Sequence, residues 1–69
     1  MNRIKEILKA KGITQTWLAE KMNKSYTTIN EYVRNVRQPS VEDLYEIADI
    51  LQVQATDLLV NKKNNNDGN

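Results

Sequence analysis

Residues that end a helix alternate along this chain with residues that begin one. The first group is a glycine and two asparagines, types that tolerate the left-handed backbone with which many helices end. The second group is three hydroxyl residues, which cap helix N-termini through their side-chain oxygens. In chain order these residues are Gly12, Thr14, Asn23, Ser25, Asn35 and Ser40. Such close spacing of stop and start signals restricts the chain to short helices.

Apolar residues between these boundaries recur three or four positions apart, which is the period of an amphipathic helix. Strand signals are weak, because no alternating segment is flanked by Asn-Gly or Asp-Gly. The predicted helices span about residues 2–11, 15–22, 26–34, 41–51 and 55–60. The sequence therefore predicts an all-α fold of five helices in one domain, residues 1–60. We expect the polar, asparagine-rich residues 61–69 to form a disordered tail, because they bury too little apolar surface to fold.

Several classes of function are disfavoured by what the chain lacks. Its 69 residues include no cysteine and no histidine, so thiolate and imidazole metal ligands and the usual general base are missing. The acidic residues of 42–49 form a carboxylate cluster, but no nucleophile or phosphate-binding glycine loop accompanies them. We expect no enzymatic activity, no metal and no cofactor. The lack of a signal peptide and of an apolar run of roughly 20 residues predicts a cytoplasmic protein that does not enter the membrane.

Charge is distributed unevenly along the sequence. The net charge of the whole chain is only +1, but residues 1–39 hold eight of the ten basic residues and three of the nine acidic ones, a balance of +5. Residues 40–69 have a balance of −4. One end of the molecule is therefore suited to meet phosphates, and the other end is not. Chance clustering in a short chain is the alternative explanation.

The predicted second and third helices are joined by only three residues, Asn23-Lys24-Ser25. Two short helices connected so tightly must cross at a steep angle. That geometry occurs in a helix-turn-helix and also in an ordinary corner between two helices of a bundle. The spacing alone does not distinguish these two arrangements.

The residues around the turn resemble the Xre/Cro/phage-repressor family of helix-turn-helix domains. The matching segments are Gly12–Met22, Ser25–Ile29, Arg37–Ser40, Leu44–Val53 and Leu58–Leu59. The Thr14-Gln15 pair that opens the second helix and the Arg-x-Pro-Ser loop that begins at Arg37 are specific in combination. The resemblance covers about residues 4–59. It implies a lambda-repressor-like DNA-binding domain of five helices, whose third helix, about residues 26–34, lies in the major groove of double-stranded DNA.

The outer face of the predicted third helix is polar. If Ile29 faces the core, the helical period turns amide, hydroxyl and charged side chains to the opposite side, where they suit base edges and phosphates. The predicted base contacts are Tyr26, Thr27, Asn30 and Glu31. The predicted contacts with the DNA backbone are Gln15, Lys24, Ser25, Arg34, Asn35 and Arg37. The resemblance also implies the contact by Gln15 and a path beside the DNA for the loop of residues 35–38. A solvated helix face is the simpler alternative.

Three features depart from the family pattern. Many members pair an arginine on the first helix with a glutamate near the end of the third, where this chain has Leu8 and Val33, so both charges are lost together. Glu31 replaces a basic or amide side chain, and it either reads a cytosine or limits non-specific binding. Trp17 replaces an exposed polar residue. We expect it to pack in the core, with contact to a DNA sugar or to a partner chain as the alternatives.

The end of the predicted domain is rich in apolar residues. The resemblance places a dimer contact around the fifth helix, and the predicted contact residues are Ile50, Val53, Leu58 and Leu59. A two-fold homodimer would present two recognition helices about 34 Å apart and would favour a palindromic operator. We interpret the chain as a sequence-specific transcriptional regulator, either a repressor or an activator. The alternative is a protein-interaction module, such as an antitoxin or a bridging factor, that binds DNA weakly.

Overall fold

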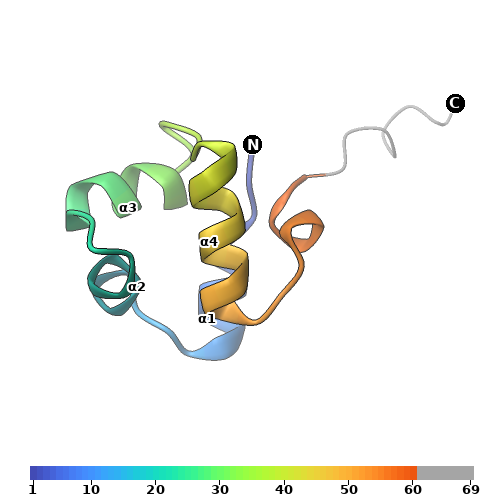
Figure 1. The fold of residues 1–69 in the computed structure, drawn as a ribbon, viewed down its shortest axis with the longest axis horizontal. Helices are drawn as coiled ribbons and strands as arrows, with labels where there is room; N and C mark the ends of the chain where they lie inside the picture. Colours follow the sequence, from blue (N-terminus) through green and yellow to red (C-terminus); the bar gives the residue numbers. More distant parts are fainter. Residues whose placement is uncertain (61–69) are drawn as a thin grey trace, which may run out of the picture.

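The computed structural model describes residues 1–60, which form four α helices and one 3₁₀ turn. In chain order they are α1 (Ile4–Lys11), α2 (Gln15–Met22), α3 (Tyr26–Val33), α4 (Val41–Leu51) and η1 (Ala55–Leu58) (Figure 1). Within this part of the chain the only β pairing is an isolated antiparallel bridge between Asn2 and Leu59. The prediction of an all-α fold is confirmed. The predicted tail, residues 61–69, lies outside the described residues.

The helix boundaries are set by the stop and start signals of the sequence. Each predicted N-cap hydroxyl accepts a hydrogen bond from the backbone N–H three residues later, at 3.0–3.1 Å. These caps are Thr14, Ser25 and Ser40. The predicted left-handed residues are Gly12 (φ +69°), Asn23 (φ +57°) and Asn35 (φ +61°). Gln52 also has φ +60°, which the sequence did not indicate, and its side-chain Nε2 donates to the carbonyl of Asp49 at 2.9 Å.

One apolar core unites the helices. α2 packs against α3 and α4, α1 packs against α3, and η1 packs against α4. The buried side chains are Ile4, Leu8, Leu18, Ala19, Met22, Ile29, Tyr32, Val33, Ile47, Ala48, Leu51 and Leu58. None of the helices in residues 1–60 has the length and apolar character needed to cross a membrane.

Both ends of the domain differ from prediction. α1 begins at Ile4 and not at Asn2, and the fifth helix is a 3₁₀ turn that stops at Leu58. Extended backbone at the two ends explains both differences. The N–H of Arg3 donates to the carbonyl of Leu58 at 2.7 Å, and Leu59 pairs with Asn2. Residues at the start and end of the domain therefore lie side by side.

Asn2 is the buried polar residue at this junction, with a side chain only 4% exposed. Its Oδ1 accepts from the N–H of Ile4 at 3.0 Å, and its Nδ2 donates to the carbonyl of Tyr32 and to Oε1 of Gln38, each at 2.9 Å. Its backbone N–H and carbonyl bind the side-chain amide of Asn35 at 2.7 and 3.2 Å. One residue thus joins the start of α1 to the end of α3 and to the loop that follows.

We expect Asn2→Ala to lower the free energy of unfolding by about 2–3 kcal/mol, because it leaves buried polar groups without partners. Urea denaturation of the full chain would measure this loss. Glu6→Ala, on the exposed surface of α1, is the control and should change stability by less than about 0.5 kcal/mol. Equal effects of the two substitutions would contradict the role of Asn2.

Candidate nucleic-acid interface

A short, left-handed turn sets the angle between α2 and α3. Asn23 takes φ +57°, and the N–H of Lys24 donates to the carbonyl of Ala19 at 3.0 Å, which closes α2. In Figure 1, α2 is seen nearly end-on while α3 lies across the view, so the two helices cross steeply. Buried side chains of both helices, among them Leu18 and Ile29, hold this crossing together. The arrangement is a helix-turn-helix.

One face of α3 is buried and the opposite face is accessible, as the helical period predicts. Ile29, Tyr32 and Val33 face inward and are buried. The outward residues are exposed or half-buried: Tyr26, Thr27, Asn30, Glu31 and Arg34. Residues 1–60 therefore leave the outer face of α3 accessible along its whole length, with Tyr26 exposed at its first turn.

A chain of side-chain hydrogen bonds links the start of α2 to this outer face. Nδ2 of Asn30 donates to Oε1 of Gln15 at 2.8 Å, and Nη1 of Arg34 donates to Oδ1 of Asn30 at 3.3 Å. Three residues that were predicted separately as DNA contacts are thus brought together. The bonds fix the orientation of the Asn30 amide, and they leave it one further hydrogen to donate and one further lone pair to accept.

Glu31 pairs with a basic residue of the loop after α3. Its Oε1 lies 3.3 Å from Nη1 of Arg37, and its backbone carbonyl accepts from the N–H of Arg37 at 3.3 Å. The Arg37 guanidinium also lies 5.7 Å from the centroid of the Tyr32 ring. Sequence reasoning missed this pair, which holds the loop against the end of α3.

Lys24, in the turn between α2 and α3, pairs with the first turn of α4. Its Nζ lies 3.5 Å from Oδ2 of Asp43, and the same oxygen accepts from the phenol of Tyr32 at 2.8 Å. The Asp43 carboxylate therefore connects the turn, α3 and α4. Burial and then the hydrogen bond to Asp43 raise the pKa of the Tyr32 phenol above its ordinary value.

Two of the residues predicted to contact the DNA backbone, Ser25 and Asn35, have side chains that make hydrogen bonds within the protein. The hydroxyl of Ser25 caps α3 and also donates to Oγ1 of Thr28 at 3.0 Å. The amide of Asn35 binds Asn2 through both of its polar atoms, and its Oδ1 also accepts from Nε2 of Gln38 at 3.1 Å. The amide of Asn35 therefore holds the N-terminus in the free chain, and the contact of Asn35 with the DNA backbone stays a prediction.

Comparisons with known proteins agree with this geometry. A helix-turn-helix family model of the Cro/C1 type matches residues 4–58. The chain belongs to the Cro/C1-type helix-turn-helix family. A solved structure from Bacteroides fragilis, described as that of a proposed DNA-binding protein, has a TM-score of 0.83 and 43% sequence identity. The match covers 84% of this chain and 94% of that one. The search of curated proteins found no match.

The apolar pair that replaces the arginine and glutamate of many family members lies in the core of this Cro/C1-type domain. Leu8 on α1 and Val33 on α3 are 4% and 3% exposed, so the apolar pair is buried as a unit. No buried charge is left at either position, and no desolvation penalty arises there.

The expectation that Trp17 packs in the core is wrong. Its side chain is 40% exposed, and Nζ of Lys21 lies 5.3 Å from the centroid of its ring. The residue lies in the first turn of α2, whose buried side comes from Leu18, Ala19 and Met22. The position immediately before Leu18 therefore turns outward.

One predicted dimer residue is not available for an interface. Leu58 is 0% exposed and belongs to the core, so its prediction as a dimer contact is corrected. Ile50 and Val53 are half-buried and pack against the core. Leu59 remains 43% exposed, with Val60 and Met1 exposed near it along the paired termini.

The environment of Tyr32 predicts a loss of stability in alkali. Its pKa is higher in the folded chain than in the unfolded one, so its contribution is present below about pH 10 and is lost as pH rises through the raised value. Urea denaturation between about pH 8 and pH 11 should show this loss. Tyr32→Phe should make it smaller, whereas Tyr45→Phe, at a site 63% exposed, should not. Equal pH profiles for the two variants would contradict the assignment.

Proposed function

We propose that this chain is a sequence-specific transcriptional regulator that binds double-stranded DNA with α3 in the major groove. The observation that carries the proposal is the polar outer face of α3, joined through Asn30 to Gln15 at the start of α2. The family and the description of the Bacteroides fragilis structure support DNA binding. A helix presented in this way matches the width of the major groove.

Base recognition is assigned to the exposed side chains of α3. The Asn30 amide can still donate and accept one hydrogen bond each, which is what the edge of an adenine requires. Thr27 offers a hydroxyl and a methyl group, and Tyr26 offers a phenol at the first turn of the helix. These groups would read bases, since they stand on the outer face of α3.

Phosphate contacts are assigned to the basic and amide residues around that face, namely Gln15, Lys24, Arg34 and Arg37. Lys24 and Arg37 are paired with Asp43 and Glu31 in the free chain, so phosphates would compete with carboxylates for them. Glu31 could either read a cytosine or limit non-specific binding. Its ion pair with Arg37 favours the second role.

A homodimer on a palindromic operator completes the proposal. The surface beside the paired ends of the domain exposes Met1, Leu59 and Val60. In Figure 1 the orange segment that follows α4 lies on the opposite side of α4 from the start of α3. A second copy docked there would let both recognition helices face the same DNA.

Selection of binding sites from a random pool of duplex DNA tests the readout. We expect a defined half-site, and we expect Thr27→Ala to relax preference at one base pair by about 1 kcal/mol or more. Thr56→Ala, an exposed threonine on η1, is the matched control and should leave the preference intact. Recovery of no sequence preference, or of binding without salt dependence, would favour the protein-interaction module instead.

Analytical ultracentrifugation tests the dimer. We expect the wild-type chain to dimerise at concentrations of tens of micromolar and Leu59→Asp to be monomeric, because the new charge would be buried between the copies. Val41→Asp places the same charge at a position 68% exposed on α4 and should leave the dimer unchanged. A monomeric wild-type chain would rule the dimer out.

A further inference from the structure

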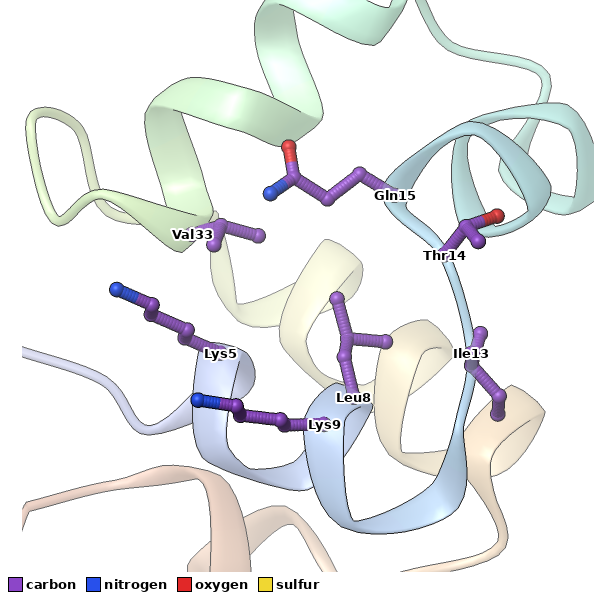
Figure 2. A pocket seen from close by; sticks show the side chains of 7 residues that line it. All are labelled: Lys5, Leu8, Lys9, Ile13, Thr14, Gln15 and Val33. Atoms are coloured by element: carbon purple, nitrogen blue, oxygen red, sulfur yellow. The ribbon is translucent and has the colours of Figure 1, made fainter.

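A hollow of about 250 Å³ opens between α1, α3 and the start of α2. Its floor is apolar and consists of Leu8, Ile13 and Val33, and polar groups stand around it (Figure 2). We propose that this hollow seats the sugar–phosphate backbone of duplex DNA, with Lys5 and Lys9 holding a phosphate. The inference rests on the proposed function and extends the interface to α1.

The two lysines are placed as a pair. They are four residues apart on α1 and therefore lie on the same face of the helix. Figure 2 shows both side chains leaving α1 in the same direction, with Val33 above Lys5 in this view. Within residues 1–60 neither lysine has an acidic partner. Two like charges at this spacing repel each other, and an anion between them would remove the repulsion.

The rest of the lining fits a phosphodiester backbone. Gln15 reaches over the hollow from the start of α2 (Figure 2), and its Oε1 is the atom that binds Asn30 of α3. The hollow is thus continuous with the outer face of α3. A deoxyribose offers carbon atoms to the apolar floor, while the adjoining phosphate offers charge to the lysines. The hollow is open to solvent and not enclosed, as a continuous DNA strand requires.

The salt dependence of binding to a mixed-sequence duplex tests this site, since phosphate contacts do not depend on sequence. The double variant Lys5→Gln/Lys9→Gln of the full chain should reduce the slope of log K against log salt by about 0.9 for each phosphate lost. Lys5→Arg/Lys9→Arg should retain the wild-type slope. Lys11→Gln/Lys21→Gln removes the same charge outside the hollow and should change the slope less.

Each outcome has a definite meaning. A steep wild-type slope that the Lys5→Gln/Lys9→Gln variant leaves unchanged, or that both glutamine variants reduce equally, would overturn the site on α1 and leave the proposed function standing. A wild-type chain without salt-dependent DNA binding would overturn both. Saturable binding of inorganic phosphate to the wild-type chain, followed by NMR at Thr14 and Gln15 without DNA, together with an unchanged slope for Lys5→Gln/Lys9→Gln, would assign the hollow to a free anion and overturn the backbone assignment.

Discussion

The buried side chain of Asn2 closes the domain on itself. It binds the first turn of α1, the last turn of α3 and the loop that carries Gln38, all from a position that is 4% exposed. A buried amide is stable only when its donors and acceptors are used, and here they are. The loop between α3 and α4 consequently has a fixed path, and Arg37 is held next to Glu31 at the end of α3.

The basic residues of the proposed interface are divided into two groups. Lys24 and Arg37 already have carboxylate partners in the free chain, so DNA would exchange one counter-charge for another. Lys5 and Lys9 have none within the described residues and would gain a counter-charge only from DNA. Salt should therefore affect the contribution of the two groups to DNA binding differently, although both lie in the positively charged half of the sequence.

Local signals in the sequence predicted most of the fold. The caps at Thr14, Ser25 and Ser40 depend on bonds only three residues apart, and the buried side of α3 follows from its period around Ile29. Apart from Trp17 and Gln52, sequence reasoning failed where contacts join distant residues. Asn2 bonds to Asn35, and Leu58 fills the core next to the N-terminus, and neither contact leaves a trace in local spacing.

The pairing of the domain's two ends bears on how the protein is made. The N–H of Arg3 donates to the carbonyl of Leu58, a residue that a ribosome adds more than fifty residues later in synthesis. A nascent chain that already contains the whole helix-turn-helix still lacks Leu58, whose side chain is part of the core and whose carbonyl accepts from the N–H just before α1. Products that end before Leu58 would therefore lack this closure and would be ready substrates for proteolysis.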